Sequence, residues 1–539
     1  MPQLNTPKAP SAGALAILLL LAVASLWMPW LGDCLFYSKG EPREAIVAMS
    51  MLQSGDWVLP VTAGEMPYKP PMLAWLISIF AVVFNGGVVN EFVARMPSAL
   101  AAIAMVMATF FWARRHRSDQ FALAAAMVLA TSFEVFRAAE ACRVDMVLTA
   151  CMVGAIFMLQ RLIDDPDTPR RWWRRVAVVL LLSGAFLTKG PIGAFLPLLA
   201  VGIYVLILRK DKWLTIGKLA LFGLASLLLP AVWYYAAYLH GGQAFFDLAW
   251  EENFGRLSGT MSYESHVNPF YYNFLTILSG MAPWTLLFLF TAHIGWKRRS
   301  RPAAGAAMTL TAALTVIIFY CIPASKRSVY LLPAYPFMAY GVAVLVDLAA
   351  KSKPMLLFNR IVAALAVIVP VAVCVSAVIP FGKFSFTADH WWRWCLLFVP
   401  VMCGLAALIT RNGCKGAAPG FACIWAILLC YNAAVMPAAV NPLSAKPVAE
   451  ELRREAAGHP IYTLGDIATH PTYSLAYYLN NQMNITHTAD LDTLAPGSVV
   501  IITDAADTVA VADTAAFTLR QLTPRLADTR RPAYLAIRR

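Results

Sequence analysis

Ionisable side chains collect where long apolar segments of this chain begin or end. A charge at the edge of a hydrocarbon layer is costly, so these residues are the first candidates for function. Five loops that we expect on one face contain the following: Asp33, Lys39, Glu41, Arg43, Glu44, Asp56, Lys69; Arg137, Glu140, Arg143, Asp145; Lys189; Asp247, Glu251, Glu252, Arg256, Glu264, His266; Lys326, Arg327, Tyr330. Together these loops predict a polar cavity that opens to water on that face.

The mixed signs of these charges indicate a substrate with a phosphate and a second polar group. Arginine binds phosphate through two parallel hydrogen bonds, and lysine adds a point charge. Lys69 stands out because Pro70 and Pro71 fix the chain immediately before an apolar helix. Asp145 stands out because it begins an apolar segment. The alternative for any single residue is a solvated loop position, since loops are normally polar.

The elements that must position these residues are membrane helices. The chain has 539 residues, of which 60% are hydrophobic and 14% are charged. A soluble domain is nearer to half apolar and a quarter charged. The apolar residues form blocks long enough to cross a bilayer, which takes about 20 residues. The first block, Gly13 to Gly32, has no convincing cleavage site, so we interpret it as a retained helix and not a signal peptide.

Basic clusters between the apolar blocks predict the topology. They occur at 114–117, 170–175, 209–212, 297–301, 351–360 and 411–415. Two crossings fit between neighbouring clusters, so all clusters can face the cytoplasm. Lipid orientation then explains the formal net charge of +13, and no nucleic-acid partner is needed. We predict about 13 spans, with the N-terminus cytoplasmic and the C-terminus on the other side.

The expected spans leave one apolar segment in the interface. They lie at Gly13–Gly32, Phe92–Trp112 and near 119–136, 146–162, 176–188, 191–208, 215–238, 271–293, 304–322, 331–349, 358–380, 393–410 and 421–438. If the segment Pro70–Phe84 also spanned, the basic cluster at 114–117 would face outwards. We therefore predict that this segment lies along the outer interface.

The last hundred residues differ from the rest. We divide the chain into a transmembrane domain, 1–440, with interfacial segments in loops 33–90 and 239–270, and a domain from 441 to 539. Ile461–Thr463 and Ser498–Thr503 read as short buried strands, and His470–Leu479 and Thr514–Leu522 as helices. Strands that alternate with helices predict a small α/β domain on the outer face.

The sequence requires no cofactor. The ten cysteines lie mostly in apolar blocks and show no disulfide or zinc spacing. His266 with Glu264 are candidate ligands of a divalent metal such as zinc, but two residues match no strong pattern. We find no phosphate-binding loop or dinucleotide fingerprint, so the sequence gives no support to a nucleotide-sugar donor.

The motifs, taken in order, resemble the lipid-linked sugar transferases of the GT-C class. The first loop contains Glu41 and Arg43, then Gly55-Asp56-Trp57, then Lys69-Pro70-Pro71. The pieces EFVARMPSAL, CRVDMVLTA, LTKGPIG, APWTLLF and SKRSVYLLPAYP follow. The chain is most similar to the 4-amino-4-deoxy-L-arabinose transferases of lipid A, through nearly all of residues 13–440. It departs from their pattern where Gly40 replaces an aspartate and Glu44 a tyrosine.

The resemblance implies a sugar donor, an acceptor and a subcellular location. The donor is undecaprenyl phosphate that carries the aminopentose, and the acceptor is a phosphate of lipid A. The enzyme would lie among the lipids of the bacterial inner membrane, with its active site and C-terminal domain in the periplasm. The product would confer resistance to polymyxin and cationic peptides. We expect a monomer.

The same resemblance assigns expected roles. Lys69, Arg43 and Arg256 would neutralise the polyprenyl phosphate as it leaves. Asp145 and Glu41 would orient the sugar or stabilise its oxocarbenium-like centre. Tyr330 and Lys326 would lie near the lipid phosphate. The remaining expected contacts to substrate come from Glu44, Asp56, Tyr68, Arg143 and Lys189.

Two other functions remain open at this point. A protein O-mannosyltransferase would have the same scaffold, but its hydroxyl acceptor would need a general base. A lipid flippase or transporter would be favoured by inverted repeats, and the sequence shows none.

Overall fold

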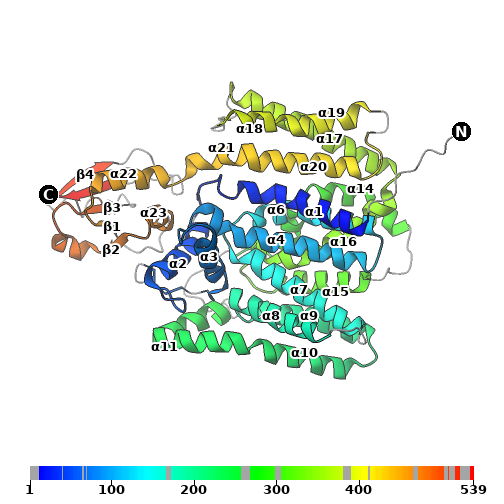
Figure 1. Cartoon of the computed structure of the whole chain (residues 1–539), viewed down its shortest axis with the longest axis horizontal. Coiled ribbons are helices and arrows are strands. Elements are labelled where there is room, and N and C mark those ends of the chain that lie inside the picture. The colour runs from blue at the N-terminus through cyan, green and yellow to red at the C-terminus, as the bar shows by residue number, and fades with distance from the viewer. Residues whose placement is uncertain are drawn as a thin grey trace.

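The structure is a computed structural model, and it is mainly helical (Figure 1). It describes residues 11–38, 40–62, 66–67, 69–165, 171–255, 267–297, 305–379, 386, 390–410, 413–464, 472–502, 508, 511, 516–521 and 534–539. The helices of the first half are α1 (Ala12–Trp27), η1 (Met28–Trp30), α2 (Gly40–Ser54), α3 (Met72–Phe84), α4 (Glu91–Arg114), α5 (Asp119–Ala130), α6 (Phe133–Ala139), α7 (Val144–Asp164), α8 (Arg171–Lys189), α9 (Ile192–Leu208), α10 (Lys212–Ser226), α11 (Leu228–Trp250) and η2 (Glu251–Gly255).

The second half continues the helical domain and adds a small sheet. Its helices are α13 (Tyr272–Gly280), α14 (Trp284–Lys297), α15 (Ala306–Cys321), η3 (Ser328–Ala334), α16 (Tyr335–Ala349), α17 (Lys353–Ser376), α18 (Trp391–Leu396), α19 (Phe398–Ile409), α20 (Ala418–Cys430), η4 (Tyr431–Val435), α21 (Met436–Val440), η5 (Asn441–Leu443), α22 (Lys446–Ala456), α23 (Thr472–Tyr478) and η6 (Thr488–Thr493). The strands are β1 (Ile461–Leu464), β2 (Met483–Thr486), β3 (Val499–Ile502), β4 (Phe517–Gln521) and β5 (Tyr534–Arg538).

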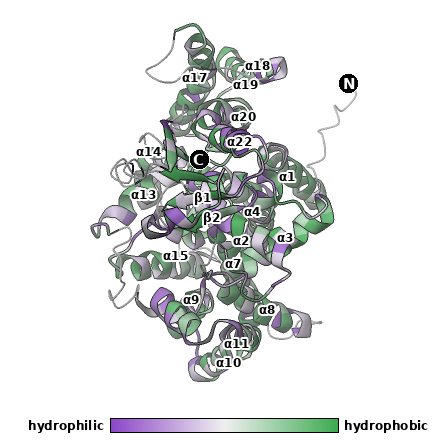
Figure 2. Cartoon of the chain, turned by 90° about the vertical axis from the view of Figure 1, so that its left-hand side faces the viewer, coloured by the Kyte–Doolittle hydropathy of each residue, from purple (hydrophilic) through white to green (hydrophobic). Residues whose placement is uncertain are grey.

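The chain is a multi-pass membrane protein. Within the described residues, 8 helices are long and apolar enough to cross a bilayer, or up to 10 if the bent pairs α5–α6 and α13–α14 each count as one span. The predicted total of about 13 is reached only by adding α8 and the shorter apolar helices α9 and α15. In Figure 2 the ribbons of the helical domain contain much green, the colour of hydrophobic residues.

The basic loops after α4 and α9 meet the ends of α7 and α16 at one end of the helical domain. Arg115 at the end of α4 pairs with Asp165 at the end of α7, and Arg117 pairs with Asp347 of α16, with 3.4 Å between nitrogen and oxygen. Arg209 donates a hydrogen bond of 2.9 Å to the carbonyl oxygen of Ile163. These loops therefore share one end, as the charge pattern predicts. The assignment of that end to the cytoplasm stays a prediction.

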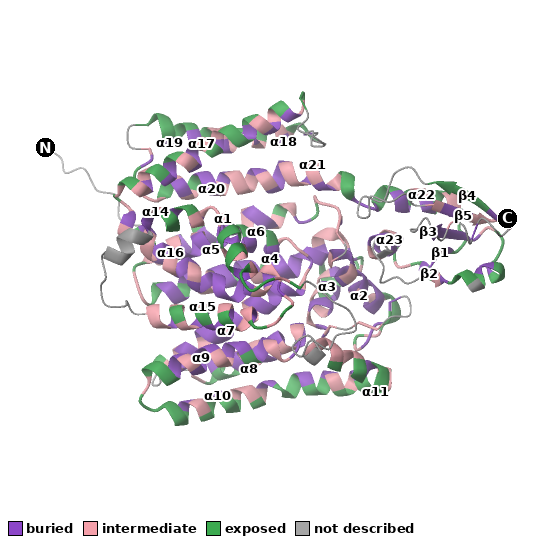
Figure 3. Cartoon of the chain, turned by 180° about the vertical axis from the view of Figure 1, so that it is seen from behind, coloured by how far each residue is buried: buried purple, intermediate pink, exposed green. Residues whose placement is uncertain are grey.

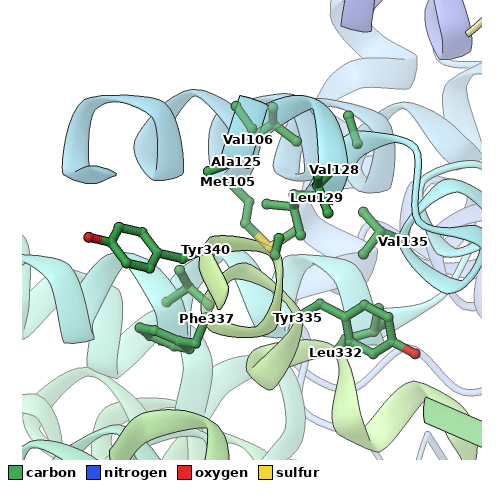
Figure 4. Close-up of a cluster of buried hydrophobic side chains, with 14 of the residues drawn as sticks. Met105, Val106, Ala125, Val128, Leu129, Val135, Leu332, Tyr335, Phe337 and Tyr340 are labelled. Carbon is green, nitrogen blue, oxygen red and sulfur yellow. The ribbon is translucent and has the colours of Figure 1, made fainter. Parts of the chain in front are cut away.

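The core lies where α4, α5, α7 and α16 pack together (Figures 3 and 4). Small residues such as Ala125 let the helices approach closely, and aromatic rings fill the space that remains. The Trp112 ring stacks on Phe157 with 4.8 Å between centroids, and its N–H donates to the side-chain oxygen of Gln160 at 2.8 Å. The buried indole is thus satisfied within the apolar core.

Helices α2 and α3 lie together at the opposite end from the basic loops (Figure 1). The 13 residues of α3 give a length of about 20 Å, whereas the hydrocarbon layer is about 30 Å thick. The helix is therefore too short to cross, which agrees with an interfacial position. The Ser78 hydroxyl donates to the carbonyl oxygen of Ala48 at 3.2 Å and fixes α3 against α2.

The C-terminal domain is a five-stranded mixed sheet in the order β2-β1-β3-β5-β4, with α22 and α23 beside it. Strands β1 and β3 and helix α23 lie where the sequence predicts strands and a helix. The prediction of a helix at Thr514–Leu522 is wrong, because Phe517–Gln521 forms the edge strand β4, antiparallel to β5. Phe517 is buried while the next four residues are exposed, so pairing with β5, distant in sequence, decides the conformation.

Tyrosines of α23 attach this domain to the helical domain. The Tyr478 hydroxyl donates to the carboxylate of Glu91 at 2.9 Å and accepts from the backbone N–H of Phe36 at 2.8 Å. The Tyr477 hydroxyl donates to the carbonyl oxygen of Val89 at 3.1 Å. The contacts fix α23 beside the first loop, close to the N-terminal ends of α2 and α4.

Candidate functional site

Glu41, in the first turn of α2, lies in a buried ion pair. Its two carboxylate oxygens accept hydrogen bonds from Arg95 of α4 at 2.9 and 3.2 Å, and one also accepts from the backbone N–H of Cys142 at 2.9 Å. Arg95 in turn donates to the carbonyl oxygens of Leu31 and Cys34. Glu41 as a whole is only 7% exposed. Its carboxylate connects three segments of the chain.

Glu44, one helical turn further along α2, belongs to a different cluster. Its carboxylate forms ion pairs with Lys69 and with Arg43, the latter at 3.2 Å. Lys69 comes from the loop before α3, where Pro70 and Pro71 restrict the backbone. About a fifth of each cationic side chain remains exposed. This cluster therefore faces an open space, unlike the Glu41 pair.

Asp145 is the third carboxylate of the region, and it lies in the first turn of α7. It is 4% exposed, and one oxygen pairs with Lys189 of α8 at 2.7 Å. Its other oxygen lies 3.5 Å from Arg143. The Lys189 ammonium also lies 4.2 Å from the centre of the Tyr330 ring, a cation–π contact. Asp145 is thus held between the cations Arg143 and Lys189, and Tyr330 of η3 packs against Lys189.

The two clusters meet at Lys69. An open cavity of about 910 Å³ is lined by Lys69, Lys189, Glu252, Asn253 and Tyr330 together with apolar side chains. A second cavity of about 490 Å³ is lined by Arg43, Glu44 and Lys69 with prolines, valines and Trp233. Lys69 and Pro70 line both cavities, and the charge of Lys69 acts on Asp145. Asp145 lines neither cavity, but it is bound to Lys189, which lines the larger one, so Lys69 and Asp145 belong to one cluster of charges.

The cluster has a surplus of positive charge. Its cations are Arg43, Lys69, Arg143, Lys189 and Arg327, and its carboxylates are Glu44, Asp145 and Glu252. Burial lowers the pKa of Lys69 to about 7; Glu44 opposes this shift, and Arg43 adds to it. The pKa of Glu44 is lowered because Lys69 and Arg43 outweigh its burial. Burial and Arg143 also lower the pKa of Arg327. Such a site favours an anionic ligand that would neutralise the cations.

Gly40 explains how Arg143 reaches this cluster. A Cβ atom at position 40 would collide with the guanidinium group of Arg143. The sequence departs from the aspartate of the resembled pattern at this position, and the arginine side chain uses the space that results. Arg143 therefore lies at the start of α2 as well as beside Asp145.

Two predicted binding residues stabilise loops instead of lining a cavity. The Asp56 carboxylate accepts hydrogen bonds from the backbone N–H groups of Val58 and Leu59, at 2.8 and 3.0 Å. The buried ammonium group of Lys326 donates to the carbonyl oxygens of Asn268 and Pro323, at 3.2 and 2.6 Å. Neither side chain lines the two cavities.

Five candidate residues lie outside the described part of the chain: Lys39, Tyr68, Arg256, Glu264 and His266. The predicted metal ligands Glu264 and His266 are among them. Among the described residues no group of three or more histidine, cysteine or acidic side chains could hold a metal ion. The metal therefore stays a prediction.

Sequence reasoning assigned no role to Asn253, which lines the larger cavity. Its amide donates to the carbonyl oxygen of Ala249 at 2.7 Å and to the Tyr234 hydroxyl at 3.4 Å. The amide oxygen lies where a Cβ atom at Gly190 would be, so the glycine leaves room for Asn253 beside the residue that follows Lys189. The Lys189-Gly190 pair was the available signal, since a glycine beside a functional lysine indicates close approach of another group.

The chain is similar to several known proteins. Residues 68–235 match the family described as dolichyl-phosphate-mannose-protein mannosyltransferase. Two uncharacterised proteins of Aquifex aeolicus are each 29% identical over 60% and 56% of this chain; the chain covers 62% and 66% of their lengths. An undecaprenyl phosphate-alpha-4-amino-4-deoxy-L-arabinose arabinosyl transferase of Edwardsiella ictaluri is 25% identical over 69% of this chain and 73% of its own.

Solved structures give the fold. The crystal structure of ArnT from Cupriavidus metallidurans bound to undecaprenyl phosphate has a TM-score of 0.76, with 20% identity over 98% of both chains. This likeness covers the transmembrane part and the C-terminal sheet domain. The protein is therefore a polytopic membrane protein with the GT-C fold of ArnT, and it resembles the arabinosyl transferases in sequence.

Proposed function

We propose that this protein transfers 4-amino-4-deoxy-L-arabinose from undecaprenyl phosphate to a phosphate group of lipid A. The observation that carries the proposal is the surplus of cations around Glu44 and Asp145, at the mouth of two cavities with apolar walls. Both substrates combine a phosphate with a long apolar part, and the site offers a surface for each. The similarity to arabinosyl transferases supports the choice of sugar and acceptor.

A lipid donor suits the position of the site. Lys69 lies between the two cavities, so the donor phosphate and the acceptor phosphate can approach it from different sides. Pro70, Pro191, Ile192 and Phe319 provide apolar surface for the polyprenyl chain in the larger cavity. The sequence shows no nucleotide-binding motif, which favours a donor that is dissolved in the bilayer.

The reaction needs stabilisation of negative charge more than it needs a base. An oxygen of the acceptor phosphate is already anionic and attacks the anomeric carbon. The bond from that carbon to the polyprenyl phosphate breaks, and the electron pair leaves with the phosphate. Lys69 and Arg43 stabilise this developing charge, and Lys189 and Arg143 add to it. The fixed cations act without reorganisation of water during the reaction.

Asp145 and Glu41 take different parts in this proposal. Asp145 lies between Arg143 and Lys189, and Lys189 lines the larger cavity, so the carboxylate would act on the sugar from behind this lysine and stabilise the oxocarbenium-like centre. Both oxygens of Glu41 are engaged by Arg95, so Glu41 is a positioning residue that fixes the start of α2. Tyr330 positions Lys189 through its ring.

The expected location is the bacterial inner membrane, with the site and the C-terminal domain in the periplasm. The basic loops at the other end of the molecule then face the cytoplasm. We expect the chain to act as a monomer and the modified lipid A to lower the binding of polymyxin. Lys69 and Arg43 stand at the periplasmic boundary of the bilayer, within reach of lipids on that side.

Mass spectrometry of lipid A tests the proposal. Cells with the gene should add an aminopentose to lipid A, and cells with the gene deleted or with Lys69→Ala should not. A second assay would offer the purified protein a mannosyl polyprenyl phosphate and a serine-rich peptide. Transfer to the peptide with unchanged lipid A would overturn the proposal in favour of a protein mannosyltransferase, the activity after which the family matched at residues 68–235 is described.

A further inference from the structure

A third cavity lies at the opposite end of the helices that hold the candidate site. It measures about 1200 Å³ and is formed by the C-terminal end of α7, the N-terminal half of α8 and the helix α10. Asp145 begins α7 and Lys189 ends α8, whereas this cavity adjoins Ile163 and Arg171 at their other ends. At 1.5 Å per residue, the two sites are about 25 Å apart along these helices.

Four cations line this cavity against one carboxylate. They are Arg171, Arg175, Arg209 and Lys218, and the carboxylate is Asp211. Asp211 lies 3.5 Å from Arg209, and no acidic side chain pairs with Arg175 or Lys218 in the part of the chain that the structure describes. The surplus of positive charge favours an anion, and arginine favours a phosphate in particular.

One of these arginines has a buried donor without an acceptor. Arg171 and Arg209 donate to the carbonyl oxygens of Leu162 and Ile163, at 3.2 and 2.9 Å. The Nε–H of Arg209 faces the Asp211 carboxylate, whereas the buried Nε–H of Arg171 makes no hydrogen bond within the described residues. A buried donor without an acceptor is unfavourable, so a ligand that supplies oxygen atoms would be stabilised there.

The surroundings of the cavity indicate that the anion belongs to a lipid. Val179, Leu221 and Phe222 provide an apolar wall that continues from the cations along α8 and α10. Trp172 at the start of α8 and Trp213 at the start of α10 are 70% and 80% exposed. Exposed tryptophan at helix ends marks the level of the lipid headgroups. A soluble phosphate would need only the cations and would gain nothing from the apolar wall.

We propose that the cavity between α7, α8 and α10 binds an anionic glycerophospholipid, with the phosphodiester on Arg171, Arg175 and Lys218 and an acyl chain along Phe222. Basic pockets between membrane helices commonly hold such headgroups. The site is separate from the proposed transfer reaction and does not depend on it. Because α8 also holds Lys189, a bound lipid would restrain the helix that carries this cation.

Native mass spectrometry of the full-length purified protein tests this site with dioleoylphosphatidylglycerol as the probe and dioleoylphosphatidylcholine as the neutral comparison. The triple variant Arg171→Gln, Arg175→Gln, Lys218→Gln removes three cations from the cavity. The control Lys351→Gln, Lys353→Gln, Arg360→Gln removes three from the loop between α16 and α17 and the start of α17, which does not line it. Arg175→Gln alone serves if the triple variant does not fold, because this residue is exposed.

The expected result is selective binding of the anionic lipid by the wild type and by the control. The triple variant should bind it about a hundredfold more weakly, because each cation near an anionic headgroup contributes a factor of about five. Equal binding of both lipids, or equal loss in the variant and the control, would overturn the proposal. So would full displacement of the lipid by glycerol 3-phosphate at matched concentration, which would show that the apolar wall contributes nothing.

Discussion

Glu41 and Glu44 are the same residue type, three positions apart on α2, and the tertiary structure puts them in opposite situations. Glu41 is enclosed, and Arg95 and the N–H of Cys142 occupy its oxygens. Glu44 faces a cavity and shares its carboxylate between Lys69 and Arg43. Protein donors occupy both oxygens of the Glu41 carboxylate. The cluster around Glu44 instead has more positive than negative charges, which favours the binding of an anionic ligand.

The difference shows why a charge at a membrane boundary is an ambiguous signal. A buried ion pair contributes little net stability, but loss of one partner leaves an uncompensated charge and is strongly destabilising. A cluster at a cavity affects the binding of substrate instead. Both glutamates are buried, so it is the hydrogen bonding of the carboxylate and the exposure of its partners that separate a residue that supports the fold from one that supports the reaction. Matched substitutions at the two glutamates would measure this separation.

The largest expected effect is on stability, from Glu41→Gln. Removal of this carboxylate charge leaves Arg95 buried without its partner, and we expect a loss of about 3–5 kcal/mol in the free energy of unfolding. Thermal unfolding in detergent checks the value. Glu44→Gln is the matched control. Glu44 is itself only 9% exposed, but its partners Lys69 and Arg43 lie at a cavity and keep about a fifth of their side chains exposed, so we expect a smaller loss of stability than for Glu41→Gln. Equal destabilisation by both substitutions would contradict the comparison.

The next effect is on the reaction, from Lys69→Ala. Loss of a fixed cation at the developing charge should reduce the rate of aminopentose transfer by about a hundredfold to a thousandfold. The protein should still insert and remain folded, since Lys69 lies at a cavity and not in the core. Turnover of undecaprenyl phosphate aminoarabinose by the purified variant is the measurement. A normal rate would exclude the phosphate-binding role of Lys69.

A pH dependence follows from the same lysine. Burial and Arg43 lower its pKa to about 7, so the protonated form that binds phosphate is lost as the pH rises through this value. We expect kcat/KM to decrease above pH 7 and to approach about a tenfold loss per pH unit. Lys69→Arg keeps its charge, so its profile should be flat up to pH 9. A wild-type profile that is equally flat would refute the assignment.

The smallest effect concerns the space beside Arg143. In Gly40→Ala the new methyl group displaces the end of a flexible arginine side chain, which costs little stability. The displaced guanidinium group should slow transfer by about tenfold, because misplacement of a binding group weakens its contact with the reacting atoms. Gly217→Ala is the control, since a Cβ atom there meets no neighbour within 4 Å. Equal activity of the two variants would remove Arg143 from the site.

Sequence patterns predicted the elements that depend on local composition. The apolar blocks predicted the membrane helices, and the short interfacial α3 followed from its length and from the charges beyond it. Asp145 and Lys69 were chosen because a charge or a rigid turn beside an apolar segment needs a reason. The structure brings them together with Arg43, Glu44, Arg143, Lys189 and Tyr330.

One predicted element was wrong because its conformation depends on a partner strand. The helix expected at Thr514–Leu522 is the strand β4, since pairing with β5 outweighs local propensity. Asp56 and Lys326 have charges as promising as that of Lys69, and the structure places both in hydrogen bonds to backbone groups two or three residues away. The types and spacing of the charges do not reveal which of them the backbone will occupy.

The sequence by itself determined that this protein lives in a bilayer, because about 20 consecutive apolar residues have no other favourable environment. It also predicts which loops share a side, because positive charge is retained on the cytoplasmic side. Only the tertiary structure decided which charges are saturated and which remain for a ligand. Pairing depends on distances of a few ångströms between segments far apart in the chain, such as Glu41 with Arg95 and Asp145 with Lys189.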